Sequence, residues 1–381
     1  MHRRTHSATF TVLVSVALLA GALVMGAVLL LSGAPLALVV GTVLAAVPVL
    51  PVVGCYLWLD RYEPEPRSLL ALGLGWGAFV ATAVALVLQF FDSFAFGGTD
   101  AFRAVVVAPV TEEGAKGLFI VLLLLFRRQE FDGILDGIVY AGMVGIGFAF
   151  TENILYLASA YVGVDGSTGG LESAVGLFIF RCLFSPFAHP VFTAFTGIGV
   201  GIAVLSRNRT VRVLAPIGGY ALAVCAHGLW NASMMLQGGD GAVATYLFLM
   251  IPAFLLVAAF ALWMRAREGR LLAAALADCA ARGYLPAAEI PWLVRLPGRR
   301  VCRRHAQQTG GVHARRAMSD YQREAIELAY LHHRYLRGAP PPGFAAVGQQ
   351  HIDAMRELRP RLIWPPAQPV RQVAAVNGGV A

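Results

Sequence analysis

The amino-acid sequence predicts an all-α, polytopic membrane protein, and three observations support this fold class. The chain of 381 residues is 57% hydrophobic and only 14% charged, with a mean hydropathy of +0.66. A soluble domain carries about 25% charged residues. The apolar residues gather in segments of about 20, which is the length that a helix needs to cross a bilayer. Arginines recur in every second loop between these segments.

These segments predict about eight transmembrane helices. The first follows a basic start that is typical of a signal peptide, but its apolar run is longer than such a peptide needs, so we expect an uncleaved helix. The sixth contains Pro186 and Pro190, which predict a kink or a division into two pieces. The expected spans are residues 9–32, 36–59, 68–91, 103–126, 134–159, 174–205, 213–236 and 243–264.

The charge pattern predicts the orientation of these helices. Arginines lie at the amino terminus, in the loops after the second, fourth and sixth spans, and after the last span. By the positive-inside rule, both termini are expected in the cytoplasm. The net charge of +8 is interpreted as this bias and not as nucleic-acid binding. The five cysteines show no CxxC spacing, so neither a disulfide framework nor a zinc ribbon is predicted.

The chain is expected to have two parts, a membrane domain at 1–264 and a cytoplasmic tail at 265–381 that is rich in Arg and Pro. Within the tail, residues 319–338 predict an amphipathic helix that begins with a capping box at Ser319 and Gln322. The histidines of the tail are interpreted as solvent-exposed side chains.

Four predicted spans carry polar side chains that are costly in lipid, since a charge near the bilayer centre costs about 3 kcal/mol or more. At 1.5 Å per residue, Glu112, Glu152 and His227 lie roughly 10–13 Å from the outer ends of their helices. His189 comes out at roughly 20 Å, in a span that the prolines are expected to kink. The similar depth of the other three, in the outer half of the bilayer, predicts one site between four helices. The polar residues are Glu112, Glu113 and Lys116, then Glu152, then Arg181 and His189, then His227 and Asn231.

The residue types in this layer are suited to hydrolysis. Lys116, the only lysine of the chain, follows Glu112 and Glu113 at helical spacing, so its ammonium can reach either carboxylate. A glutamate can activate water while histidine or asparagine stabilises the oxyanion. Glutamate and two histidines are also the ligands of many hydrolytic zinc sites. Spacing alone leaves both mechanisms open. Arg181 is expected to snorkel or to pair with a glutamate.

Other functions would use the same residues differently. A secondary transporter would form a proton relay from them, but it would need polar residues toward both membrane faces. Here the inner half of the spans is largely apolar and no inverted repeat is visible. An inactive membrane scaffold, or charges that only hold helices together, are the remaining alternatives.

Several ordered motifs resemble the PrsW family of intramembrane proteases, which belongs to a wider superfamily with the CAAX prenyl endopeptidases and bacteriocin-processing enzymes. The resemblance covers about residues 50–235. The motifs are "EEGAK" at 112–116, "FAFTE" at 148–152, His189 and "HGLWN" at 227–231, with "DRYEPEP" at 60–66 and the stretch 131–156 in support.

The resemblance implies an intramembrane endopeptidase with Glu112 and Glu113 as catalytic residues and Glu152, His189 and His227 completing the site. In the CAAX-type relatives the second motif ends in His, whereas here it ends in Glu152. This departure leaves open whether Glu152, His189 and His227 bind Zn²⁺ or the site works without metal. Our hypothesis makes Glu112 the base, with Glu113 and Lys116 orienting it and Asn231 assisting at the oxyanion.

The resemblance also implies a substrate and a location. The expected substrate is a single-pass membrane protein cut near its extracytoplasmic side, such as an anti-sigma factor at the first step of regulated proteolysis. The expected location is the bacterial cytoplasmic membrane, with the lipid bilayer as surroundings and no nucleic-acid partner. The identity of the substrate, the trigger, the role of the tail and the oligomeric state are not predicted.

Overall fold

The computed structural model describes residues 2–95, 98–128, 130–163, 168–235, 240–336 and 343–366. Every regular element in these ranges is a helix, and they contain no strand. The chain forms two compact units, Met1–Arg265, called the membrane unit below, and Ala266–Ala381, called the tail unit.

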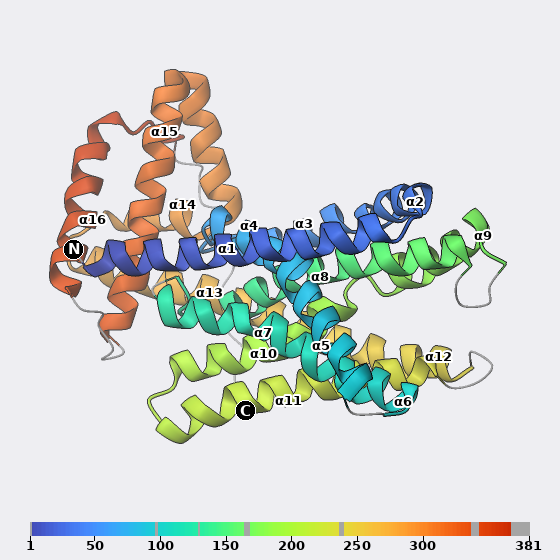
Figure 1. Ribbon diagram of the computed structural model, residues 1–381. Coiled ribbons are helices and arrows are strands. Elements are labelled where there is room, and N and C mark those ends of the chain that lie inside the picture. Colours follow the sequence, from blue (N-terminus) through green and yellow to red (C-terminus); the bar gives the residue numbers. More distant parts are fainter. Residues whose placement is uncertain are drawn as a thin grey trace, which may run out of the picture. The chain divides into compact units, whose positions relative to one another are not determined.

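The membrane unit is built from long apolar helices, some of which include a stretch of π-helix (Figure 1). Its elements are α1 (His2–Leu31), α2 (Pro35–Ala46), α3 (Val49–Leu59), α4 (Arg67–Gly75), η1 (Trp76–Ala81), α5 (Thr82–Ala95), α6 (Asp100–Phe102), η2 (Arg103–Val107), α7 (Ala108–Phe126), α8 (Ile134–Val162), α9 (Gly170–Phe178), η3 (Ile179–Phe184), α10 (Ala188–Leu205), α11 (Arg209–Met234), α12 (Asp240–Thr245), η4 (Tyr246–Met250) and α13 (Ile251–Ala281), the last of which continues into the tail unit.

In the described residues, seven helical stretches are long and apolar enough to cross a membrane: Ala8–Leu31, Pro35–Leu59, Arg67–Ala95, Ile134–Val162, Gly170–Leu205, Arg209–Met234 and Val243–Ala281. They match seven of the predicted spans. The remaining predicted span corresponds to α7, which is apolar except for the charged side chains of Glu112, Glu113 and Lys116. The all-α, polytopic fold class is confirmed, and the chain is an integral membrane protein.

The predicted sixth span is divided into two pieces. The π-helix η3 ends at Phe184, and α10 begins at Ala188, so Pro186 lies in the break. The hydroxyl of Ser185 donates to the carbonyl oxygens of Phe180 and Arg181 and satisfies the end of the first piece. The break places His189 in the first turn of α10, where it can face the interior of the unit.

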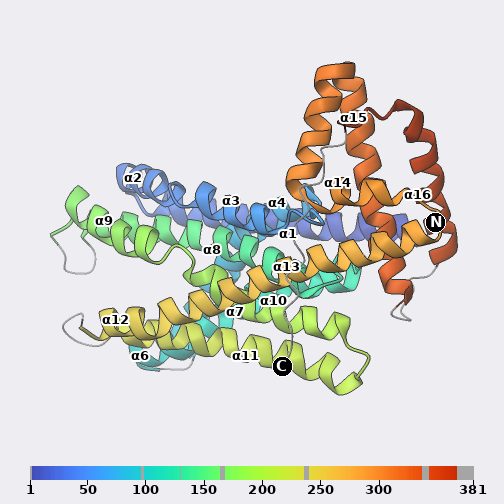
Figure 2. The same cartoon turned by 180° about the vertical axis from the view of Figure 1, so that it is seen from behind.

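Helix α8 is the most buried of the spans and packs against α2, α4, η1 and α10. In Figures 1 and 2, α10 and α11 also lie side by side. A Cβ built on Gly145 would lie 2.7 Å from the Cα of Pro190, so only glycine permits this approach of α8 to α10. The contact holds His189 against α8. A similar approach occurs at Gly147, where a Cβ would lie 1.9 Å from the carbonyl oxygen of Leu74.

Aromatic residues fix α7 in the same interior. The indole Nε1 of Trp76 donates to the carbonyl oxygen of Ala115 at 2.9 Å. The rings of Trp76 and Phe119 pack with centroids 5.8 Å apart, and Phe119 is fully buried. These contacts hold the polar face of α7 toward α8, α10 and α11, with which it packs.

A second group of buried acids lies where the 60–66 loop meets α8, and we call Asp60, Glu65, Asp136 and Tyr140 the loop cluster. The backbone N–H of Glu65 donates to Asp60 Oδ2 at 2.8 Å, and the Tyr140 hydroxyl donates to Glu65 Oε2 at 2.6 Å. Burial, with added repulsion from Asp136, raises the pKa of Asp60 to about 8 and that of Glu65 to about 10. Both carboxyls of the loop are therefore largely protonated at neutral pH.

The tail unit is also helical, with η5 (Ala287–Glu289), α14 (Ile290–Val294), α15 (Leu296–Leu336), α16 (Phe344–Leu358) and η6 (Arg359–Arg361). Gly311, at φ +73°, interrupts α15 and divides it into two limbs, which run side by side in Figures 1 and 2. The predicted capping box is wrong, because Ser319 lies inside the second limb instead of at a helix start. His332 is only 4% exposed and contacts Asp278, so the expectation of solvent-exposed tail histidines is wrong for this residue.

Candidate active site

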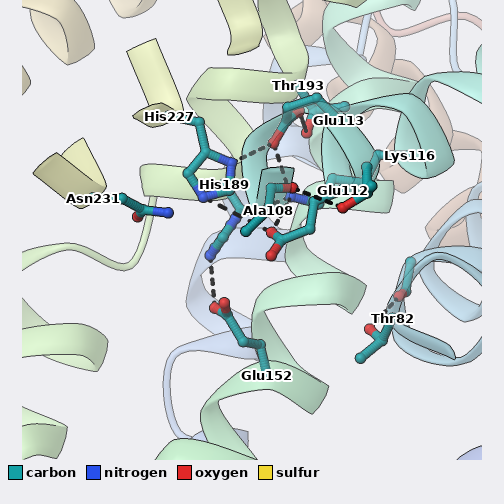
Figure 3. A network of polar contacts seen from close by, with 12 residues as sticks. Thr82, Ala108, Glu112, Glu113, Lys116, Glu152, His189, Thr193, His227 and Asn231 are labelled. Atoms are coloured by element: carbon teal, nitrogen blue, oxygen red, sulfur yellow. Dashed lines mark hydrogen bonds and ion pairs between the residues drawn. The ribbon is translucent and has the colours of Figure 1, made fainter. Parts of the chain in front are cut away.

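Four helices bring six of the seven predicted site residues into one network of contacts (Figure 3). Helix α7 contributes three of them, and α8, α10 and α11 contribute one each. The predicted convergence of the four spans is therefore present in the structure. We call these residues the site cluster: Glu112, Glu113, Lys116, Glu152, His189 and His227.

Glu113 is the fully buried centre of the site cluster. Its Oε1 accepts hydrogen bonds from Lys116 Nζ at 2.8 Å and His227 Nδ1 at 3.0 Å. Its Oε2 accepts from the hydroxyl of Thr193 at 3.0 Å. Because an ionised carboxylate can only accept, His227 carries its proton on Nδ1. The lone pair of His227 is then on Nε2, which lies 3.8 Å from Glu112 Oε2.

Lys116 is completely buried, and its ammonium has a partner on each side. Besides Glu113, Nζ contacts Glu112 Oε2 at 3.5 Å and His189 Nδ1 at 3.1 Å. It also lies 3.7 Å from the centroid of the Phe148 ring. A compact ammonium has three N–H donors and can bind Glu112, Glu113 and His189 at once, whereas the planar guanidinium of arginine is shaped for paired acceptors. This arrangement gives a physical reason for the single lysine of the chain.

His189 connects Lys116 to Glu152. The ammonium of Lys116 has no lone pair, so Nδ1 of His189 must accept and Nε2 must carry the proton. That N–H donates to Glu152 Oε2 at 2.8 Å. The ring also packs edge-on against the ring of His227, with centroids 5.1 Å apart.

Glu152 is held mainly by Arg181 of η3. The guanidinium donates through Nη2 to Glu152 Oε2 and through Nε to Asn153 Oδ1, the latter at 2.8 Å. It also covers the ring of Tyr156 at 4.1 Å. Arg181 thus pairs with a glutamate, which is one of the two roles expected for it.

Glu112 is the least tightly held of the acids in the site cluster. Its hydrogen bonds, from Lys116 Nζ and Gln89 Nε2, are 3.5 Å and 3.4 Å long. Its side chain borders an open cleft of about 610 Å³. The same cleft is lined by Glu152, His189, His227 and Asn231, by the charged Asp92, Asp100, Arg103 and Arg181, and by apolar residues that include Leu177, Phe180, Trp230, Met234 and Met235.

Asn231 is the predicted site residue that stands apart. It lines the cleft, but its Nδ2 donates to the carbonyl oxygen of Ala104 at 2.8 Å. Ala104 belongs to the π-helix η2 that leads into α7. The bond therefore ties α11 to the entrance of α7. One of the two hydrogens on the Asn231 amide remains available to the cleft.

Sequence reasoning missed the neutral partners of the site cluster. Thr193, Gln89 and Asn153 each contact a charged site residue or its partner. Polar but uncharged residues in an apolar span give little signal by themselves. Thr193 could have been found by its spacing, because it lies one helical turn after His189 on α10.

In the described residues, one group of side chains could hold a metal ion: ligand atoms of Glu112, His189 and His227 lie within 4.8 Å of one another. Histidine and carboxylate are the donor types of hydrolytic zinc sites. His227 fits best, because metal-binding histidines donate their other N–H to a carboxylate, as it does to Glu113. The donor types therefore fit one divalent cation, which would have to displace Lys116 or Glu152 from His189. Glu152, suggested as a ligand by the sequence, is outside this group and contacts Arg181.

Comparisons with known proteins agree with this site. Residues 65–257 match the sequence model of the PrsW family, described as intramembrane metalloproteases. Protease PrsW of Geobacillus kaustophilus is 30% identical over 149 residues, which cover 39% of this chain and 60% of that protein. The proteases PrsW of Oceanobacillus iheyensis and Clostridioides difficile are 27% and 28% identical, covering 57% and 51% of this chain and 92% and 79% of theirs. No solved structure matches the chain.

A helical membrane protein with buried hydrolytic donors and these relatives is an intramembrane peptidase. More narrowly, the chain belongs to the PrsW family of intramembrane metalloproteases, as its motifs indicated. The family match ends at residue 257, so the tail unit lies outside it.

Proposed function

We propose that the chain is an intramembrane endopeptidase that hydrolyses a peptide bond of a single-pass membrane protein, with Glu112 as the general base. The observation that carries this role is the contrast between neighbours on α7. Glu113 is completely buried and has three hydrogen-bond partners. Glu112 borders the cleft, and its two hydrogen bonds are long. A base needs a lone pair that can reach a water molecule in the cleft.

Glu112 and His227 together would position that water. The lone pair on His227 Nε2 lies 3.8 Å from Glu112 Oε2, so both atoms can accept its hydrogens. Glu113 and Lys116 act as positioning residues: Glu113 fixes the tautomer of His227, and Lys116 holds both carboxylates.

The reaction would proceed by two transfers of one proton. The water oxygen forms a bond to the carbonyl carbon while Glu112 takes a proton from the water. The resulting tetrahedral intermediate collapses when Glu112 gives that proton to the amide nitrogen, and the carbon–nitrogen bond breaks. The second N–H of Asn231 borders the same cleft and would stabilise the oxyanion, while the N–H of His189 stays bonded to Glu152.

A zinc ion held by Glu112, His189 and His227 would take one oxygen of Glu112 and would displace Lys116 or Glu152 from His189. It would polarise a carbonyl group and acidify a bound water, and the other oxygen of Glu112 would remain the base. The presence of zinc is tested by measuring bound zinc in the purified protein and in His227→Ala, a readout that does not depend on activity. A wild-type protein without bound zinc, after purification in zinc-containing buffer, would contradict the ligand role.

The lining of the cleft supports an apolar substrate. Leu177, Phe180, Trp230 and Met234 line it together with the polar residues. An apolar segment of a membrane helix can pack against these side chains while its peptide bond reaches Glu112. The outer-half depth of the site cluster and the PrsW membership support cleavage near the extracytoplasmic side of an anti-sigma factor, as the first cut of regulated proteolysis. The arginine pattern supports a cytoplasmic membrane location with both termini inside.

The test uses purified protein in liposomes with a panel of tagged single-pass membrane proteins, including anti-sigma factors of the host. We expect wild-type protein to cleave at least one of them and Glu112→Gln to slow that cleavage by about 10²–10⁴-fold. Glu65→Gln is the matched control, since it changes a buried glutamate of the loop cluster. If Glu112→Gln cleaves at the wild-type rate, Glu112 is not the general base. If the wild-type protein conducts protons and cleaves no substrate, a transporter is favoured.

A further inference from the structure

A cleft in the tail unit gathers arginine side chains. It has a volume of about 450 Å³ and is lined by Arg300, Arg303, Arg304, Gln307, Gln308 and Arg315. All are on α15, and Arg315 comes from the limb after Gly311. In the part of the chain that the structure describes, no acidic residue lines this cleft. The tail unit is outside the family match, so the cleft is independent of the proposed proteolytic function.

The charged residues in the surrounding sequence are almost all positive. Between Glu289 and Asp320 the chain has seven arginines and no acidic residue. Arg300 and Arg304 are four residues apart on one helix face, a spacing at which like charges destabilise a helix. Four guanidinium groups around one cleft therefore repel each other unless an anion lies among them.

Part of the cleft is held in place by polar contacts. Arg303 Nη1 donates to Gln322 Oε1 at 2.7 Å, and Gln322 is only 2% exposed. Arg315 Nη1 donates to Gln307 Oε1 at 3.0 Å and so joins the two limbs of α15. Arg300, Arg304 and Arg315 also border the cleft, and each guanidinium has five N–H donors with which it can bind a ligand.

We propose that this cleft binds a phosphate-bearing anion. Arginine forks match phosphate oxygens in pairs, and such charge-assisted hydrogen bonds are among the strongest in proteins. Among the described residues no aromatic ring lines the cleft and could stack a nucleobase, so the recognised group is the phosphate itself. This chemistry is shared by the headgroup of an anionic phospholipid and by a soluble phosphate compound.

The first experiment uses the full-length protein in neutral detergent at low ionic strength, with inorganic pyrophosphate as the probe and calorimetry as the measurement. We expect the wild type to bind, and the pair Arg300→Gln with Arg304→Gln to weaken binding by about 10-fold or more, as expected for lost hydrogen bonds to charged groups. Both residues are exposed, so the pair should leave the fold intact. Arg295→Gln with Arg316→Gln removes the same charge from exposed positions outside the cleft and should bind like the wild type.

The second experiment distinguishes the two sources of phosphate. The same binding is measured in nanodiscs of phosphatidylcholine alone and of phosphatidylcholine mixed with phosphatidylglycerol. Pyrophosphate binding that disappears only with phosphatidylglycerol assigns the cleft to a lipid headgroup, and binding that persists in both discs assigns it to a soluble anion. The proposal is overturned if wild-type protein binds pyrophosphate in neither detergent nor phosphatidylcholine discs, or if the control pair weakens binding as much as the cleft pair.

Discussion

The membrane unit buries two groups of carboxyl side chains, and it compensates them by different means. In the site cluster, carboxylates face Lys116, Arg181 and two histidines. In the loop cluster, the carboxyls accept hydrogen bonds from backbone N–H groups and from the hydroxyl of Tyr140. One group thus lies against fixed cations, while in the other the raised pKa of Asp60 and Glu65 leaves the loop carboxyls largely neutral. Burial is offset by ion pairs in the site cluster and by hydrogen bonds to neutral carboxyls in the loop cluster.

The largest expected effect tests whether the cation of the site cluster is required. Lys116→Met leaves Glu113 buried without its ammonium partner, and breaking a buried pair in this way costs about 3–5 kcal/mol. We expect loss of cleavage together with a lowered melting temperature in detergent. The double variant Lys116→Met with Glu113→Gln should recover the melting temperature but not the cleavage. A fully stable Lys116→Met would show that the site cluster does not depend on its cation.

A smaller effect is expected when only the orientation of His227 is disturbed. Glu113→Gln keeps the shape of the side chain but removes the carboxylate that accepts from Nδ1. Loss of such a partner typically costs 10–100-fold in activity or metal affinity, so we expect about that loss in kcat. Steady-state cleavage assays check it. A loss as large as that of Glu112→Gln would instead make Glu113 the base.

The neutral state of the loop cluster should make the melting temperature depend on pH. The folded pKa values of Asp60 and Glu65, about 8 and about 10, lie above their ordinary values, so folding takes up protons. The stabilisation is full below about pH 4 and is lost as pH rises toward 10. We expect the melting temperature to fall between pH 5 and pH 9 in the wild type, and to fall less in Asp60→Asn with Glu65→Gln. Equal slopes in the two proteins would refute a neutral loop cluster.

The smallest effect concerns Thr193. Its hydroxyl donates one hydrogen bond to Glu113, and Thr193→Val removes it at nearly constant volume. A net loss of about 1 kcal/mol corresponds to roughly a five-fold decrease in cleavage, with expression unchanged. Thr196→Val, one turn further along α10, is the control, since Thr196 is buried and its Oγ1 has no hydrogen-bond partner among the described residues. Indistinguishable variants would mean that the Thr193 bond contributes nothing to the site.

Two kinds of feature of this site were predictable from sequence. One depends on the spacing of residues along a helix, and the other on the free-energy cost of placing an ionisable side chain in lipid. Lys116 meets two carboxylates because helical geometry places residues three and four apart on one face. His189 and His227 were found because ionisable groups are costly in lipid. Seven of the eight predicted spans, which followed from length and hydropathy alone, match stretches long and apolar enough to cross a membrane.

Tertiary details were not predictable. Asn231 bonds to Ala104 in a π-helix, and nothing in the residue pattern marks that local change of helix type. The tautomer of His189 follows from Lys116, which is 73 residues away in the chain. In the tail unit, the second limb of α15 begins at a backbone reversal, so Ser319 has no helix end to cap.

The pairing of Lys116 with its own helix has a consequence for biosynthesis. The partners of Glu113 on α10 and α11, Thr193 and His227, are 80 and 114 residues later in the chain. When α7 enters the bilayer, those helices have not yet been translated. Lys116 is on the same helix as Glu112 and Glu113, so its positive charge offsets one of the two negative charges. The newly made segment then has a net charge of one instead of two. Lys116 thus lowers the net charge that α7 brings into lipid before the other helices of the site cluster are present.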